Sequence, residues 1–113
     1  MKVYGQERVN TYFNSTQQSP AIGALQGGVG GYVVTWSSYD QDAGDNTYGI
    51  FAQRYTQSGI AVGPEFRVNT YQPGSQVDPK VVGLSDGGFL IVWTDQNGHK
   101  VCGLVLQVIY QIL

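Results

Sequence analysis

The apolar residues of the chain fall in short runs that are separated by glycine-rich turns. Two runs, YVVTW at Tyr32–Trp36 and FLIVW at Phe89–Trp93, are nearly continuous in apolar residues. A proline-containing run precedes each one, SPAIGAL at Ser19–Leu25 and DPKVVGL at Asp78–Leu84. Short runs of this composition predict strands. The two continuous runs predict burial on both faces, and each proline predicts the start of a strand or an edge position.

Three further runs complete this pattern. YGIFAQRY at Tyr48–Tyr55 and CGLVLQVI at Cys102–Ile109 follow polar loops, and AVGPEFRVNTY at Ala61–Tyr71 follows the turn TQSG. Before the C-terminus, no window of the sequence has the i, i+3, i+4 apolar spacing of a helix. The sequence therefore predicts an all-β fold of antiparallel strands.

The chain also contains an internal repeat. The letters RVNTY occur at Arg8–Tyr12 and again at Arg67–Tyr71, and other landmarks recur in the same order. The aligned pairs are Gln17 with Gln76, Pro20 with Pro79, Leu25 with Leu84, Trp36 with Trp93, Gly49 with Gly103 and Gln53 with Gln107. A unit of roughly 55–60 residues with four short strands is typical of β-propeller blades and similar arrays. We assign residues 1–65 to an N-terminal strand plus the first repeat and residues 66–113 to a second, divergent repeat, which together form one domain.

Three motifs carry a resemblance: Y-G-I-x-x-Q-R in the first copy, E-F-x-V-N-T at the junction and D-G-G-F-x-x-x-W in the second copy. They are similar to a repeat found in tandem in very large secreted or cell-surface proteins of bacteria and some protists. The resemblance covers about Gln6 to Tyr110. It implies two four-stranded antiparallel β-propeller-like repeats, or blades, with an adhesive or scaffolding function and no catalytic residues.

Composition excludes several function classes. The net charge is −2 and the six Lys and Arg residues are scattered, so the sequence predicts no basic face for nucleic acid. The single cysteine, Cys102, excludes an intrachain disulfide and a thiolate zinc site. His99 has no second histidine or cysteine at ligand spacing and no catalytic motif is present, so we predict no enzyme. The run VCGLVLQVIYQIL is too short to cross a membrane as a helix.

The same composition bears on location. MKVYGQERVN has no apolar core of a signal peptide, which indicates either an intracellular chain or a piece of a longer secreted product. Low Lys and Glu content with abundant Tyr, Thr, Asn and Gly favours the second alternative. We therefore expect an extracellular or cell-surface location.

One loop, SSYDQDAGDNTYG, concentrates oxygen ligands at Asp40, Asp42 and Asp45. Carboxylates at alternating positions are suited to Ca²⁺, and Gly44 would let the loop curl. No Glu closes the loop at the distance that an EF-hand requires. Solvated turn residues are the alternative interpretation, so calcium is a hypothesis and no other cofactor is predicted.

Aromatic residues beside the polar loops form a second candidate site. Trp36 and Trp93 each end an apolar strand, and Tyr39 follows Trp36 closely. If these rings are exposed, they can stack on sugars; if they are buried, they are core residues. The recurrence of both tryptophans in the same frame favours a structural role. Glycan binding is therefore the alternative function.

The strand count predicts assembly with other copies. The second unit lacks the fourth strand that EFRVNTY supplies to the first, while a strand of that type stands at Val3–Tyr12. We expect this strand to complete the second unit of a neighbouring chain, head to tail, in a ring, in a filament or as part of a longer chain. The residues assigned to this contact are Val3, Tyr4, Arg8 and Val9 on the incoming strand and Leu104, Leu106 and Val108 on the receiving one.

Overall fold

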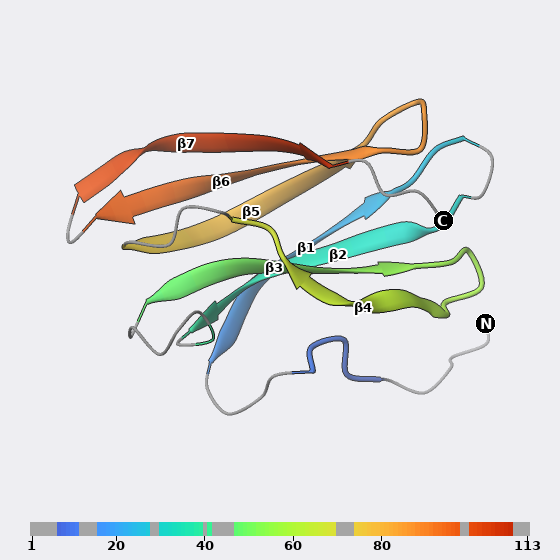
Figure 1. The fold of residues 1–113 in the computed structure, drawn as a ribbon, viewed down its shortest axis with the longest axis horizontal. Helices are drawn as coiled ribbons and strands as arrows, with labels where there is room; N and C mark the ends of the chain where they lie inside the picture. The colour runs from blue at the N-terminus through green and yellow to red at the C-terminus, as the bar shows by residue number, and fades with distance from the viewer. Residues whose placement is uncertain are drawn as a thin grey trace, which may run out of the picture.

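The computed structural model describes residues 7–11, 16–27, 30–39, 41, 47–69, 74–97 and 100–109, with the backbone alone for residues 97 and 100–109. The described residues form seven strands and no helix (Figure 1). The strands are β1 (Gln17–Ala24), β2 (Tyr32–Tyr39), β3 (Tyr48–Tyr55), β4 (Ala61–Arg67), β5 (Ser75–Gly83), β6 (Phe89–Asn97) and β7 (Lys100–Ile109). The all-β class that the apolar runs predict is confirmed.

The strands form two antiparallel sheets. The first sheet has the order β1-β2-β3-β4, and the second has the order β5-β6-β7. Each strand pairs with the one before it in the chain, so both sheets are simple meanders joined by the segment between β4 and β5. Figure 1 shows the sheets as two layers, with β5 running beside β1.

The two sheets have corresponding registers. In the first sheet Val34 pairs with Ile22 on one side and with Gln53 on the other. In the second sheet Ile91 pairs with Val81 and with Gln107. These are the positions that the sequence alignment places together, so aligned residues occupy the same places in their sheets.

Of the two positions predicted for the prolines, the start of a strand or a sheet edge, the structure shows the edge position. β1 begins at Gln17 and β5 at Ser75, and both prolines lie within their strands. A β-bulge interrupts the pairing between Gln18 and Ala21 in β1 and between Val77 and Lys80 in β5. A bulge leaves a residue unpaired, and both strands stand at a sheet edge, so the missing proline N–H breaks no ladder bond.

Side chains alternate along the central strands, which gives each sheet two faces. We call one the front face; it carries Tyr32, Val34 and Trp36 in the first sheet and Phe89, Ile91 and Trp93 in the second. The other is the back face; it carries Val33, Thr35 and Ser37 in the first sheet and Leu90, Val92 and Thr94 in the second. The alignment of the two copies places front-face residues of the first sheet with front-face residues of the second, and back-face residues with back-face residues.

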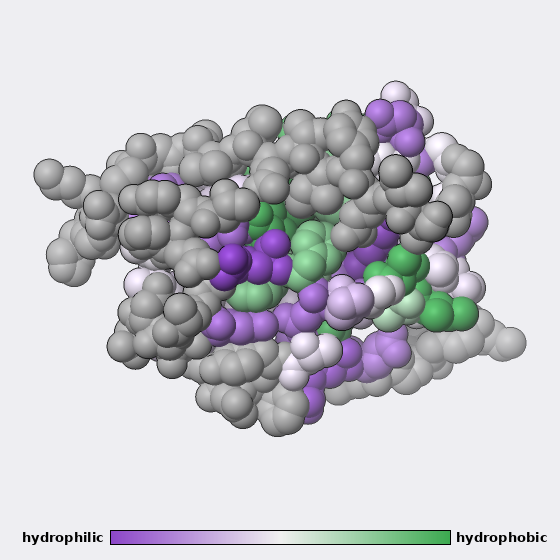
Figure 2. Space-filling model, in the orientation of Figure 1, coloured by the Kyte–Doolittle hydropathy of each residue, from purple (hydrophilic) through white to green (hydrophobic). Residues whose placement is uncertain are grey.

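The sheets pack with the back face of the first against the front face of the second. One core cluster joins Val33, Ile50 and Ala52 of the first sheet to Ile91 and Trp93 of the second. In the view of Figure 2, hydrophobic residues show between the two layers and hydrophilic residues border them. The contact is therefore between unlike faces.

Close approach of β1 and β5 depends on glycine. A Cβ atom at Gly83 would lie 1.9 Å from the carbonyl oxygen of Ala24, and one at Gly23 would lie 3.2 Å from Val81 Cγ1. Any side chain at Gly83 would thus push the two strands apart.

Burial on both faces, which the continuous apolar runs predicted, holds for only one of the two strands. In β2, residues 35–38 are all buried. In β6, Phe89, Ile91 and Trp93 are buried, but Leu90 and Val92 are only half-buried. The prediction is wrong for β6 because no described sheet covers its back face.

Candidate functional site

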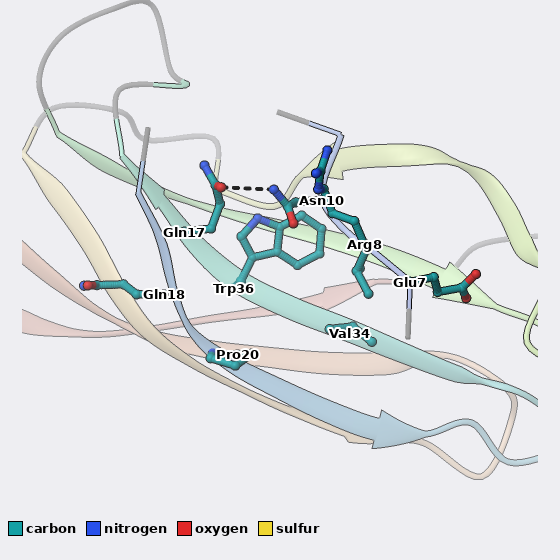
Figure 3. A pocket seen from close by; sticks show the side chains of 9 residues that line it. Glu7, Arg8, Asn10, Gln17, Gln18, Pro20, Val34 and Trp36 are labelled. Atoms are coloured by element: carbon teal, nitrogen blue, oxygen red, sulfur yellow. Dashed lines mark hydrogen bonds between the residues drawn. The ribbon is translucent and has the colours of Figure 1, made fainter. Parts of the chain in front are cut away.

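A pocket lies on the front face of the first sheet, beneath the N-terminal segment. Its cavity volume is about 290 Å³. Figure 3 shows the indole of Trp36 rising from β2 toward Arg8 and Asn10, with Gln17 beside it. The pocket is lined by Glu7, Arg8, Val9, Asn10, Gln17, Gln18, Pro20, Val34 and Trp36.

Amide side chains tie the N-terminal segment to the first sheet. Asn10 Nδ2 donates to Gln17 Oε1 at 3.0 Å (Figure 3), and Gln17 Nε2 donates to Ser38 Oγ at 3.3 Å. The segment therefore crosses from Asn10 to β1 and on to β2 through one chain of hydrogen bonds.

The same chain of hydrogen bonds recurs in the second sheet. Asn69 Nδ2 donates to Gln76 Oε1 at 3.0 Å, and Gln76 Nε2 donates to Asp95 Oδ1 at 3.2 Å. Asn69 and Gln76 are buried, and each aligns with its counterpart, Asn10 or Gln17. We call residues 8–10 and 67–69 the first and second RVN segments. Each RVN segment thus contacts the sheet that follows it in the same way.

Asn69 also joins its segment to the preceding sheet. The Ile50 N–H donates to Asn69 Oδ1 at 2.8 Å, and the Val68 N–H donates to the Ile50 carbonyl at 2.7 Å. Together with the pairing of Arg67 to Phe51, these bonds extend β4 along the edge of β3. The second RVN segment therefore links two sheets, one on either side.

Glu65 of β4 holds the N-terminal segment from the other side. Its Oε1 accepts from both the backbone N–H and the hydroxyl of Thr11. Its Oε2 accepts from Gln41 Nε2 at 2.9 Å. A carboxylate that accepts several hydrogen bonds is well suited to fix a chain segment.

Two stacked tyrosines lie at the far end of this face. The rings of Tyr32 and Tyr55 are 5.0 Å apart with an interplanar angle of 17°. Burial raises the pKa of the Tyr55 hydroxyl above its ordinary value of 10.0, and the charge of Glu7 and the Tyr32 hydroxyl raise it further. The neutral phenol is thus favoured by the folded state.

The structure separates the three aromatic residues of the predicted sugar site. Trp36 lies on the front of the first sheet and is 4% exposed, while Trp93 is 3% exposed and belongs to the core behind that sheet. Tyr39 alternates to the face opposite Trp36 and packs edge-on against Tyr48, with ring centroids 5.0 Å apart. They form no common platform, although Trp36 alone lines the pocket.

Trp36 has one further property. Its Nε1–H is buried and has no hydrogen-bond partner within the part of the chain that the structure describes. Buried indole N–H groups usually find a partner. The pocket residues Asn10, Gln17 and Gln18 were not predicted as site residues. The sequence does contain one indication of them, because Asn10 and Gln17 recur with the same spacing as Asn69 and Gln76.

Most of the remaining predicted site residues are not among the residues that the structure describes. Asp40, Asp42 and Asp45, together with Val3 and Tyr4, are outside the described residues. Among the residues that are described, no group of three His, Cys, Asp or Glu side chains is placed to hold a metal ion. Calcium binding therefore stays a prediction. Leu104, Leu106 and Val108 lie in β7, where they pair with Thr94, Val92 and Leu90.

Comparisons of the chain with protein-family models, with curated proteins and with solved structures found no match. Among the described residues, no helix is long and apolar enough to span a membrane.

Proposed function

We propose that the protein is a non-enzymatic structural module whose copies assemble head to tail by exchange of the N-terminal strand. Each sheet would be one blade of a β-propeller-like array, and the segment from Val3 to Tyr12 would be the fourth strand of a neighbour's second sheet. Adding a strand to an exposed sheet edge satisfies main-chain donors and acceptors and covers that edge.

The observation that carries this proposal is the difference in hydrogen bonding between the two RVN segments. The second segment bonds to β3 behind it and to Gln76 ahead of it. The first segment has the forward contact, from Asn10 to Gln17. For the first segment, the place of β3 would be taken by β7 of another copy. This is consistent with the second sheet, where β7 pairs with β6 in the same register in which β3 pairs with β2.

This correspondence predicts the intermolecular register. Arg67 pairs with Phe51, so Arg8 would pair with Val105 of the neighbour. The Val9 N–H would donate to the Leu104 carbonyl, as Val68 does to Ile50. Farther along the same strand, Val3 would pair with Val108, as Val62 pairs with Arg54.

Two blades span too small an arc to close on themselves, because propellers have about four to eight blades. Head-to-tail contacts close into rings or continue as filaments. Three or four copies would give a ring of six or eight blades. The sequence resemblance supports an extracellular or cell-surface setting for such an assembly.

The test is the particle mass by light scattering over a range of concentrations. The full chain should give multiples of its 12.3 kDa mass. Deleting Met1–Tyr12 should leave monomers, because the incoming strand is gone. A full-length protein that stays a compact monomer at every concentration would overturn the proposal.

A point variant separates strand addition from loss of the whole segment. Val9→Pro removes the N–H that would pair with Leu104, since proline has no donor. Val9→Ala is the matched control, because it also shortens the side chain but keeps the backbone N–H. We expect Val9→Pro to abolish assembly and Val9→Ala to retain it.

The pocket over Trp36 favours one second candidate, a lectin-like glycan-binding module. The side chains of Trp36, Asn10 and Gln17 line this pocket and offer it an apolar wall and hydrogen-bonding groups suited to a sugar. A glycan array probed with and without calcium tests it. Binding that Trp36→Ala removes would support the lectin function, and an array without signal would reject it.

A further inference from the structure

The packing of the two sheets leaves one face of each sheet without a partner sheet among the described residues. The back of the first sheet meets the front of the second. The two faces that no described sheet covers are then the back of the second sheet and the front of the first, over which the N-terminal segment lies at Trp36. Within the chain, a back face packs against a front face. The two remaining faces are again one front face and one back face, so two copies could pack through them in the same way.

Both leftover faces carry exposed apolar residues. Ile22 of β1 pairs with Val34 on the front of the first sheet and is 66% exposed. Val82 of β5 pairs with Leu90 on the back of the second sheet and is 53% exposed. Each of these faces thus carries one large exposed apolar residue among the described residues, and their significance lies in how the two positions correspond.

These two residues correspond to a pair that is in contact within the chain. Ile22 aligns with Val81, and Val82 aligns with Gly23. Val81 and Gly23 lie against each other where β5 crosses β1, close enough that a Cβ at Gly23 would be 3.2 Å from Val81 Cγ1. Ile22 on the front of the first sheet thus corresponds to Val81, and Val82 on the back of the second sheet corresponds to Gly23. In two copies of the chain, Ile22 of one and Val82 of the other could form the equivalent contact.

The open back face is also more apolar than its buried counterpart. Under the alignment, Val33 and Thr35 of the first sheet become Leu90 and Val92 in the second. Val33 and Thr35 are fully buried, whereas Leu90 and Val92 are only half-buried. A cavity of about 280 Å³ lies over this face, lined in part by Val92, Thr94 and Lys80. A face with this composition is suited to cover by another sheet.

We propose that the back face of the second sheet docks on the front face of the first sheet of a second copy, with Val82 against Ile22. This inference rests on the proposed head-to-tail function for its partner and names the surface through which the sheets meet. It is separate from strand exchange, because it uses side chains of β1 and β5 rather than the backbone edge of β7.

The N-terminal segment is compatible with this docking. Val68 packs in the core cluster with Trp93 while its segment borders β3. Val9 likewise lines the pocket with Trp36. The N-terminal segment therefore has the same position over the first sheet that the end of β4 has over the second. In the docked pair it would form part of the contact surface, as the fourth strand of the neighbouring sheet.

The docked sheets must stand farther apart than the two sheets within the chain. Ala24 takes the place of Gly83, and a Cβ at Gly83 lies 1.9 Å from the opposing carbonyl. An identical approach between copies would therefore clash at Ala24. The greater volume of Ile22 and Val82, compared with Val81 and Gly23, fills the wider space.

The test uses two charged variants, each of which spoils one face. Ile22→Asp and Val82→Asp should each remain monomeric in light scattering, since burying a lone carboxylate is costly. An equimolar mixture should form dimers and nothing larger, because one intact face of each kind remains. Ile60→Asp is the control, as Ile60 is 65% exposed and lies in the turn before β4; this variant should assemble as the unmodified chain does.

Cross-linking gives a second measurement that does not depend on loss of assembly. In the background Cys102→Ser, the variant Ile22→Cys with Val82→Cys should form a ladder of disulfide-linked chains on mild oxidation. Ile60→Cys with Val82→Cys should give no ladder. If both Asp variants assemble normally and no ladder forms, face docking is wrong, while a loss of assembly in Val9→Pro would still support strand exchange.

Discussion

Ser19 and Asp78, 59 residues apart, form a hydrogen bond across the two sheets, with Ser19 Oγ donating to Asp78 Oδ1 at 3.1 Å. Both residues have left-handed backbones, with φ of 54° and 55°, and both precede a proline at a β-bulge. Left-handed non-glycine residues are uncommon. The same unusual conformation therefore occurs at aligned positions, and the two residues that adopt it touch.

The left-handed backbone predicts an asymmetry between substitutions at Ser19. Ser19→Gly removes the hydroxyl but suits the positive φ, so it should change the free energy of unfolding by less than about 1 kcal/mol. Ser19→Val places a β-branched residue where φ is positive and should cost about 1–3 kcal/mol. Urea denaturation of both variants measures the difference. Equal stabilities would show that the bulge relaxes at no cost.

The two aligned asparagines should differ in their effect on stability. Asn69→Ala removes the acceptor of the Ile50 N–H and the donor to Gln76, in a buried place. Loss of such partners should cost about 1–3 kcal/mol. Asn10→Ala affects a half-buried contact and should cost less in a monomer. Denaturation at a concentration below assembly compares the two; a larger loss in Asn10→Ala would contradict the role we give to Asn69.

The strand positions could be predicted from the sequence because the signals are local. Runs such as YVVTW and YGIFAQRY are bounded by glycine turns, and the observed strands differ from those runs by a few residues at most. Residues that the alignment of the two copies places together also occupy corresponding places in the two sheets. The edge position of the prolines was one of the predicted alternatives, but the β-bulge with a left-handed residue before each proline was not predicted, because it has no clear sequence signature.

The candidate site was harder to predict than the fold. A single sequence does not say which face of a sheet meets which, so Ile22 and Val82 carried no signal of their own. The pocket over Trp36 depends on the N-terminal segment folding back across β2. Such long-range placements are set by tertiary packing rather than by local pattern, and they appear only when the sheets are assembled.

The two tryptophans should contribute unequally to stability. Trp93 lies in the core cluster between the sheets, so Trp93→Ala should cost on the order of 3–5 kcal/mol. Trp36 is covered by the N-terminal segment rather than by a second sheet, so Trp36→Ala should cost less. Thermal and urea unfolding give the comparison. If Trp93→Ala barely changes stability while sugar binding disappears, Trp93 is a binding residue and not a core residue.

Calcium should have no effect on stability if Asp40, Asp42 and Asp45 are solvated turn residues. A bound ion would raise the melting temperature by mass action, and a chelator would reverse the rise. We expect identical melting curves in excess calcium and in excess chelator. A rise that the triple change of these residues to Asn abolishes would instead assign a calcium site to this loop.

Tyr55 should make the protein less stable at alkaline pH. Because burial, Glu7 and Tyr32 hold its pKa above 10.0 in the folded state, the unfolded chain loses the phenolic proton at a lower pH than the folded one. The folded state then binds more protons, so the free energy of unfolding falls as the pH rises through 10 toward the folded pKa. Tyr55→Phe has no phenol to titrate, and its stability should fall less between pH 8 and pH 10.5. Glu7→Gln removes one of the lesser causes and should reduce the loss in part, which also tests whether the N-terminal segment lies over this face in solution. Equal losses in the unmodified chain and in Tyr55→Phe would show that Tyr55 titrates normally.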